Sequence, residues 1–193
     1  MTLVWTLPYI ALAVLVGGVP FGLLLGHLFA DVDLRTAGSG NIGATNAWRV
    51  AGWRAGLATL TLDLLKGLGP VLLVQTALGP GPHVGAVGLA AIAAHCWTPA
   101  LRFAGGKGVA TSAGVLLGIA PLASVVLIAL WTAIVATTRK SSLGAILTVL
   151  AAPGVFYVAA PEWLWLVAAI AGVVVLRHRS NIARIVAGTE RKV

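Results

Sequence analysis

The sequence predicts an all-α integral membrane protein with seven transmembrane segments, one of them short. Two observations support this prediction. Of the 193 residues, 59% are hydrophobic and only 9% are charged, whereas roughly a quarter of the residues in a soluble domain are charged. Apolar runs long enough to cross a bilayer, about 20 residues each, follow one another along the whole chain. The loops are too short for a separate soluble domain, so we expect residues 1–193 to form a single transmembrane domain.

The apolar segments are separated by glycine, proline and charged residues, which end helices. They cover about residues 3–29, 51–78, 84–103, 109–120, 121–137, 143–158 and 163–176. The first segment contains Gly18 and Pro20, which membrane helices tolerate where neighbouring elements satisfy the backbone. The fourth segment is short because Pro121 interrupts the chain. Such a short segment needs a thinner bilayer or cover from other parts of the protein.

The distribution of cations decides whether residues 109–137 form one span or two. If the chain breaks at Pro121 and the N-terminus is outside, no outer turn contains Lys or Arg. A single unbroken span would instead place the C-terminal cluster of Lys and Arg outside, although basic loops prefer the cytoplasm. We therefore expect seven spans with a cytoplasmic C-terminus. Topology then accounts for the net charge of +8, and nucleic acid is not expected as a partner.

Three polar segments interrupt the apolar pattern, and this topology places all three on the cytoplasmic face. They are residues 38–49 (GSGNIGATNAWR), 105–112 (GGKGVATS) and 177–193 (RHRSNIARIVAGTERKV). Glycines let backbone amides form concave anion-binding nests, and the arginine fork matches phosphate. The second segment is not a Walker motif, because the GxxxxGK[ST] spacing is absent. A glycine-rich segment alone could be a flexible connector, but three together indicate phosphate recognition.

Asp63 and Lys66 place two charges inside the second apolar segment. At positions i and i+3 they share a helix face and can pair, which lowers the cost of burying them. One interpretation is a structural ion pair that fixes helix packing. The other is a role in the functional site, which is the default hypothesis for a charge at membrane depth.

His178 is the histidine that we expect to take part in chemistry. The neighbouring cations Arg179 and Arg184 favour its neutral, hydrogen-bond-accepting form, and Asn181 adds an amide. His95 lies near the end of the third apolar segment and is a second candidate for the same site.

These segments resemble the three signature motifs of the bacterial acyl-phosphate:glycerol-3-phosphate acyltransferases, in order and over essentially the whole chain. The matching stretches are residues 39–46 (SGNIGATN), 105–111 (GGKGVAT), 178–184 (HRSNIAR) and 188–190 (GTE). Residues 63–67 (DLLKG) are similar to a further recurrent segment of that family. The family often has GHxFP before the second motif, where this chain has residues 94–99 (AHCWTP), which keep the histidine.

The resemblance implies transfer of a fatty acyl group from acyl phosphate to the sn-1 hydroxyl of glycerol 3-phosphate, giving lysophosphatidic acid in phospholipid biosynthesis. It implies a multi-pass protein of the bacterial plasma (inner) membrane, with no cofactor or metal. The charge topology places the active site at the cytoplasmic face, and we expect the protein to function as a monomer. Both substrates carry phosphate and one has a long apolar tail. These properties agree with a cationic face on a bilayer-embedded protein.

The residues expected at the reaction centre are His178, Asn181, Ser39 and Lys107. Those expected to bind substrate are Gly40, Asn41, Thr45, Asn46, Arg49, Asp63, Lys66, His95, Gly105, Gly106, Gly108, Thr111, Arg179, Arg184 and Glu190. We expect direct attack, because acyl phosphate is a mixed anhydride with a good leaving group. An acyl intermediate on Ser39 is disfavoured, because the sequence shows no Ser-His-acid pattern.

An organic-anion transporter, with broken helices and a cationic site, is the alternative function. The sequence shows no convincing internal repeat, and its polar residues gather at one face, with Asp63 and Lys66 as the exception. A scaffolding membrane protein is a third interpretation, but it would not need so many glycines and cations at one surface.

Overall fold

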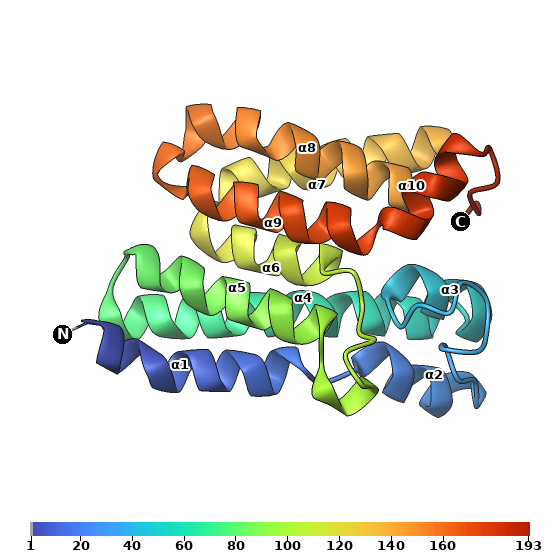
Figure 1. The fold of residues 1–193 in the computed structure, drawn as a ribbon, viewed down its shortest axis with the longest axis horizontal. Helices are drawn as coiled ribbons and strands as arrows, with labels where there is room; N and C mark the ends of the chain where they lie inside the picture. The colour runs from blue at the N-terminus through green and yellow to red at the C-terminus, as the bar shows by residue number, and fades with distance from the viewer. Residues whose placement is uncertain (1) are drawn as a thin grey trace. The chain divides into compact units, whose positions relative to one another are not determined.

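The computed structural model describes the backbone of residues 2–193 and the side chains from Val4 onward. Within this range all regular structure is helical and no strand occurs, which confirms the all-α prediction (Figure 1). The helices fall into two compact units, Met1–Val115 and Leu116–Val193.

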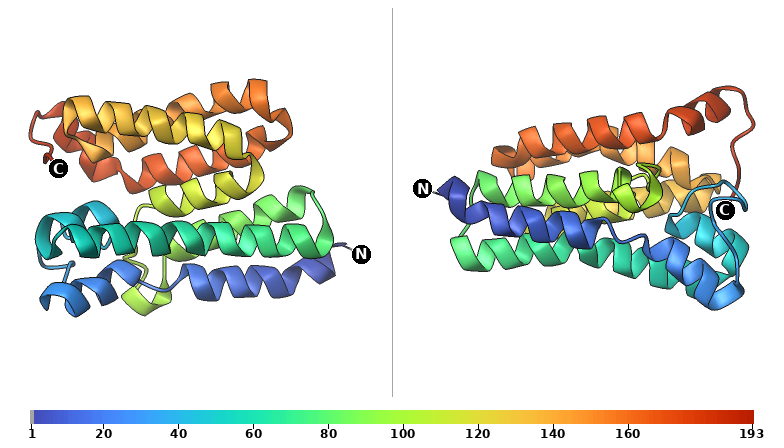
Figure 2. Two further views of the ribbon diagram at one scale, coloured as in Figure 1. Left: turned by 180° about the vertical axis from the view of Figure 1, so that it is seen from behind. Right: turned by 60° about the horizontal axis from the view of Figure 1, so that its bottom comes forward.

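The N-terminal unit is built from long apolar helices and one short polar helix. Its elements are α1 (Thr2–Gly17), α2 (Phe21–Ala30), α3 (Ala44–Ala51), α4 (Trp53–Leu78), α5 (Pro82–Cys96), η1 (Pro99–Leu101) and the first part of α6 (Val109–Ile119). α1 packs along α5 and α4, and α2 packs on α4 and α3 (Figure 2). Both halves of the first apolar segment, α1 and α2, therefore pack on the long helix α4.

The first apolar segment is broken between α1 and α2. Pro20 has no N–H group and adopts φ −86°, ψ 68°, so the α1 helix cannot continue through it. The carbonyl of Gly18 accepts a 2.8 Å hydrogen bond from Thr98 Oγ1, and that of Val19 accepts one of 3.0 Å from Lys66 Nζ. Side chains from elsewhere in the unit thus satisfy the carbonyls that the break exposes.

Glycines bring α4 and the start of α6 into backbone contact. A Cβ at Gly67 of α4 would overlap the carbonyl of Thr111, and a Cβ at Gly114 would overlap the carbonyl of Leu64. Small residues allow membrane helices to approach closely in this way. As a result, the first turns of α6 are fixed on the stretch of α4 that contains the Asp63–Lys66 pair.

The C-terminal unit is a group of apolar helices that ends in a short polar helix. It contains the end of α6, α7 (Pro121–Thr138), α8 (Ser141–Ala159), η2 (Pro161–Trp163), α9 (Leu164–Arg177) and α10 (Arg179–Val186). α8 packs between α7 and α9. Ala120, with φ −141° and ψ 79°, separates α6 from α7. The predicted interruption of residues 109–137 at Pro121 is therefore confirmed.

Five helical segments of the described chain are long and apolar enough to cross a membrane. They are Val4–Ala30, Trp53–Leu78, Pro82–Leu101, Pro121–Thr138 and Ser141–Ala159. A sixth is formed if Pro161–Arg177 and Arg179–Val186, bent by 64°, count as one span. The 11-residue α6 is shorter than these. The multi-pass character is supported, while the count of seven spans and the side of each terminus stay predictions.

Candidate functional site

A small apolar core fixes the loop that precedes α3. Leu34 is fully buried with Ala47 of α3 and Ala55 of α4, and Val32 and Val50 pack against them. Burying a leucine side chain stabilises a fold by roughly 1.5–3 kcal/mol. This core therefore holds the first polar segment against two helices.

The first polar segment is only partly a loop. Residues 38–49 are glycine-rich, but α3 begins within them, at Ala44. Asn41 Oδ1 accepts a 2.9 Å hydrogen bond from the N–H of Gly43, which forms an Asx turn leading into the helix. Gly38 and Gly40 turn the loop with φ of 61° and 72°, in a region that favours glycine.

The side chain of Asn46 fixes the conformation of this loop through hydrogen bonds to its backbone. Its Nδ2 donates to the carbonyls of Leu34 (3.2 Å) and Ala37 (3.0 Å), and its Oδ1 accepts from the N–H of Ser39 (2.8 Å). Arg49 Nη1 also donates to Oδ1, at 3.3 Å. The Asn46 residue is only 2% exposed. Asn46 was predicted to bind substrate, but these bonds favour a role in shaping the loop.

Ser39, Thr45 and Arg49 are the other candidates in the first segment. Ser39 and Thr45 are half-buried, and Arg49 is exposed. Residues 38–49 contain no His, Asp or Glu, so the segment itself provides Ser39 with no general base. The side chains therefore suit hydrogen bonding to an anion better than nucleophilic attack.

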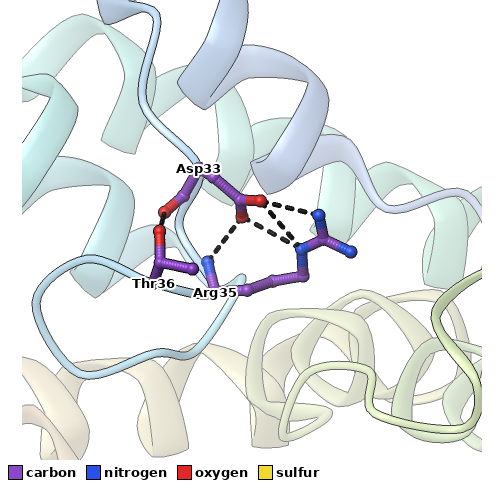
Figure 3. Close-up of polar contacts among 3 residues, drawn as sticks. All are labelled: Asp33, Arg35 and Thr36. Atoms are coloured by element: carbon purple, nitrogen blue, oxygen red, sulfur yellow. Dashed lines mark hydrogen bonds and ion pairs between the residues drawn. The ribbon is translucent and has the colours of Figure 1, made fainter.

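Arg35 is a further cation near this segment, but Asp33 holds it (Figure 3). Arg35 donates from its backbone N–H, Nε and Nη2 to the Asp33 carboxylate over 2.6–3.1 Å. These hydrogen bonds lower the pKa of Asp33 to about 2, and the carboxylate raises the pKa of Arg35. Arg49 is therefore the better candidate for phosphate.

His95 of α5 contacts and supports the second polar segment. The N–H of Gly106 donates a 3.0 Å hydrogen bond to the His95 carbonyl. The imidazole also lies against Gly106, where a Cβ would overlap Nε2, and Gly105 packs equally closely on the His95 carbonyl. Because only glycine fits at both positions, this contact fixes the backbone directly before Lys107.

Gly108 then turns the chain into α6. Its φ is 81°, and a side chain there would crowd Cys96 Sγ. α6 begins at Val109, two residues after Lys107, so a cation and a helix N-terminus occur together, and both favour an anion. Thr111, another predicted substrate contact, is fully buried against Gly67 of α4. That burial favours a packing role.

Asp63 and Lys66 form the ion pair that their spacing predicted, with 2.7 Å between Oδ1 and Nζ. The two residues are 3% and 2% exposed. Lys66 Nζ also lies 5.5 Å from the centroid of the Phe21 ring. His95 Nδ1 lies 3.7 Å from Asp63 Oδ1. Protein groups thus surround the pair, which favours a positioning role over direct contact with substrate.

His178 lies at the bend between α9 and α10. Its Nδ1 is 2.8 Å from the carbonyl oxygen of Val174, and the residue is 2% exposed. A carbonyl only accepts, so Nδ1 carries the hydrogen in this contact, and in the neutral ring Nε2 is then the acceptor. The structure therefore assigns Nε2 as the basic nitrogen of His178.

Glu190 accepts hydrogen bonds from two polar side chains of the third segment and from Ser142 of α8. Its Oε1 accepts from Ser142 Oγ (2.7 Å) and Asn181 Nδ2 (2.7 Å), and its Oε2 accepts from Arg184 Nε (2.9 Å). The Glu190 side chain is 5% exposed. Burial raises the pKa of Glu190, but these three donors outweigh it and hold the pKa below 4.5. Glu190 thus organises Asn181 and Arg184.

The structure gathers the predicted residues into separate groups. In the N-terminal unit one group is Ser39, Asn46 and Arg49, and a second is Asp63, Lys66, His95, Gly105 and Gly106. In the C-terminal unit the group is Asn181, Arg184 and Glu190. Arg179 is exposed on α10.

Sequence reasoning missed two residues of these groups. Ser142 binds Glu190, and a hydroxyl at the start of an apolar helix is a helix-start signal that could have indicated it. The ring of Phe21, the first residue of α2, lies against the ammonium group of Lys66. No sequence signal distinguishes Phe21 from other apolar residues of its segment.

The sequence model of the glycerol-3-phosphate acyltransferase family matches residues 7–188. The chain belongs to this family. A glycerol-3-phosphate acyltransferase of Geobacter sulfurreducens is 48% identical over 186 residues, covering 94% of both chains. One of Rubrobacter xylanophilus is 42% identical over 186 residues, covering 95% of this chain and 92% of the relative.

Two solved structures of this family are also similar. The crystal structure of PlsY (YgiH), an integral membrane glycerol 3-phosphate acyltransferase, in its glycerol 3-phosphate form has a TM-score of 0.92 and 34% identity, and the match covers 97% of this chain and 95% of that one. The lysophosphatidic acid form has a TM-score of 0.90 and 33% identity, covering 97% and 94%. The predicted family and membrane class are therefore confirmed.

Proposed function

We propose that this protein transfers a fatty acyl group from acyl phosphate to the sn-1 hydroxyl of glycerol 3-phosphate, giving lysophosphatidic acid and phosphate. Family membership supports the acceptor and the type of reaction. The observation that carries the proposal is the Gly105–Gly106–Lys107 backbone, which His95 seats at the start of α6. This arrangement suits a phosphate group, and both substrates have one.

The N-terminal unit supplies the proposed phosphate ligands. Lys107 and Arg49 contribute charge, and the Ser39 hydroxyl donates a hydrogen bond. The other contacts come from backbone amides and polar side chains at Gly40, Asn41, Thr45, Gly105, Gly106 and Gly108. Loops already closed by internal hydrogen bonds lose little entropy when they bind, which favours affinity.

The C-terminal unit supplies the proposed base and orienting groups. His178 Nε2, or a phosphate oxygen of a substrate with a second pKa near 6, accepts the proton of the sn-1 hydroxyl. Asn181 is held by Glu190 and orients the hydroxyl or the acyl carbonyl. The cations Arg179 and Arg184 attract the anionic substrates.

The proposed reaction is a single displacement. The sn-1 oxygen attacks the acyl carbon, its proton passes to the base, and a carbon–oxygen bond forms. The bond between the acyl carbon and the phosphate oxygen breaks, and the electron pair leaves with phosphate. Backbone amides and cations stabilise the negative charge that develops, an effect that is strong in a site of low dielectric. We propose that the protein acts as a monomer, without a cofactor or metal, at the cytoplasmic face of the bacterial inner membrane.

The test is an assay of the purified protein with glycerol 3-phosphate and palmitoyl phosphate, with palmitoyl-CoA as the alternative donor. We expect one lysophosphatidic acid and one phosphate per turnover, from palmitoyl phosphate alone. Product formed from palmitoyl-CoA but not from palmitoyl phosphate would contradict acyl phosphate as the donor. An acyl group trapped on Ser39 would contradict direct transfer. No product, but substrate-dependent flux into liposomes, would favour the organic-anion transporter.

A further inference from the structure

We propose that Asp63 and His95 are positioning residues, and that Asp63 acts through His95 to fix the loop that carries Lys107. This inference rests on the proposed function, because it assigns to these two buried residues an effect on substrate affinity without contact with substrate. Asp63 and its ion-pair partner Lys66 then have different roles, since Asp63 acts on His95 and Lys66 acts at the α1–α2 break.

Lys66 is occupied at the break between α1 and α2. Its Nζ donates to the carbonyl of Val19 at 3.0 Å, pairs with Asp63 at 2.7 Å and lies over the Phe21 ring. All three partners lie within the N-terminal unit. Lys66 therefore stabilises the broken first span, and Asp63 compensates its charge.

Asp63 has a second neighbour on the side of α5. Its Oδ1 lies 3.7 Å from Nδ1 of His95, and both residues are at most 5% exposed. This distance is longer than a hydrogen bond, so Asp63 acts on the ring through its charge, which favours a hydrogen on the nearby Nδ1. We infer that this charge favours one orientation of the His95 ring.

The ring and carbonyl of His95 support the loop directly. The carbonyl accepts a hydrogen bond from the N–H of Gly106, and the ring, at Nε2, leaves no room for a side chain at that residue. Lys107 is the next residue along the chain. A change in ring orientation would therefore move the backbone from which the lysine extends.

The same stretch of α4 holds the far side of this loop. Gly67 lies one helical turn after Asp63 and packs against the carbonyl of Thr111 in the first turns of α6. Asp63 and Gly67 thus hold the loop containing Lys107 from both of its ends. A small misplacement of binding groups by a remote change can reduce catalysis by up to about 100-fold.

The test compares KM values for glycerol 3-phosphate and palmitoyl phosphate in Asp63→Asn and His95→Gln. The glutamine removes the group at Nδ1 that faces Asp63. We expect KM for at least one substrate to rise about tenfold in each variant, with kcat changed much less, because the loop is displaced but the reacting groups remain. The two changes together should raise KM little more than either alone, since they act in series.

Two further variants control for damage to the fold. Asp63→Asn leaves Lys66 without its counter-charge, so Asp63→Asn combined with Lys66→Met removes both charges and should show the same rise in KM. Thr59→Val is the matched control. Thr59 is fully buried on α4, where its hydroxyl donates to the Ala55 carbonyl at 2.7 Å. Its methyl group faces Gly22 of α2, and the KM values of Thr59→Val should equal those of the wild type.

Hydrogen exchange of the peptide that contains Gly106, measured without substrate, supplies a readout independent of activity. We expect faster exchange in Asp63→Asn and unchanged exchange in Thr59→Val. Unchanged KM values, or a raised KM without faster exchange, would overturn the inference. If the wild type makes no product from palmitoyl phosphate, the proposed function fails, while exchange still reports whether Asp63 fixes the loop.

Discussion

Asn46 of α3 accepts a 2.8 Å hydrogen bond from the backbone N–H of Ser39, seven residues earlier. The same side chain donates to two carbonyls of the loop, so one amide fixes both sides of the turn. Asn46→Asp keeps the shape but removes both donors, and leaving a buried carbonyl unpaired costs about 1–3 kcal/mol. We expect a lower thermal midpoint and at least about tenfold weaker substrate affinity, because about 1.4 kcal/mol corresponds to a factor of ten.

Thr36→Val is the control for this variant. It removes an exposed hydrogen bond of 3.2 Å to the Asp33 carbonyl in the same loop, so both measurements should stay close to wild type. A wild-type thermal midpoint and KM in Asn46→Asp would show that the amide does not shape the loop.

Arg49 and Arg35 provide a matched pair of cations near the first polar segment. We expect Arg49→Ala to lose acyl transfer without losing membrane insertion, because it removes a proposed phosphate ligand. Lys107→Ala should behave in the same way. Arg35→Ala should keep activity within about twofold, because its guanidinium is bound to Asp33 and exposed pairs contribute little. Product formation and membrane fractionation measure both properties. Wild-type turnover in Arg49→Ala or Lys107→Ala would refute the phosphate role of that residue.

Gly106 and Gly69 differ in what a methyl group would meet. At Gly106 it would overlap the His95 ring, so Gly106→Ala should raise KM for a phosphate substrate, by the same displacement of the loop. At Gly69 on α4 nothing lies within 4 Å of the added methyl group. Gly69→Ala should leave KM unchanged and stabilise the helix by about 0.5–1 kcal/mol. Equal KM values in the two variants would contradict the close packing at His95.

Acid titration should reveal the network around Glu190. Its pKa is lowered in the folded protein, so its stabilisation is complete above the unfolded value and is lost as pH falls through the folded pKa. The thermal midpoint of wild type should therefore fall more steeply below about pH 5 than that of Glu190→Gln. Asp33, with a pKa of about 2, is present in both proteins and cancels in the comparison. Parallel pH profiles would show that the carboxylate is not bound by its three donors.

Local patterns explain what could be predicted from the sequence. The apolar segments follow from composition, the Asp63–Lys66 pair from helical spacing, and the break before α7 from Pro121. The family followed from the polar segments. The partners of the first break could not be predicted, because Thr98 is 80 residues from Gly18 and Lys66 is 47 residues from Val19. The Ser142–Glu190 contact could not be predicted either, because the two residues are 48 positions apart and no helical spacing relates them.

The break between α1 and α2 also constrains how the protein is made. The Gly18 carbonyl accepts from Thr98, and the Val19 carbonyl accepts from Lys66 in addition to the N–H of Phe21. Both side-chain donors follow the first span in the sequence. An unsatisfied carbonyl inside a bilayer costs several kcal/mol. The first span therefore reaches its final form only when α4, α5 and η1 have followed it. We therefore expect a chain that ends before Thr98 to leave the Gly18 carbonyl without its side-chain donor and to have a less stable first span.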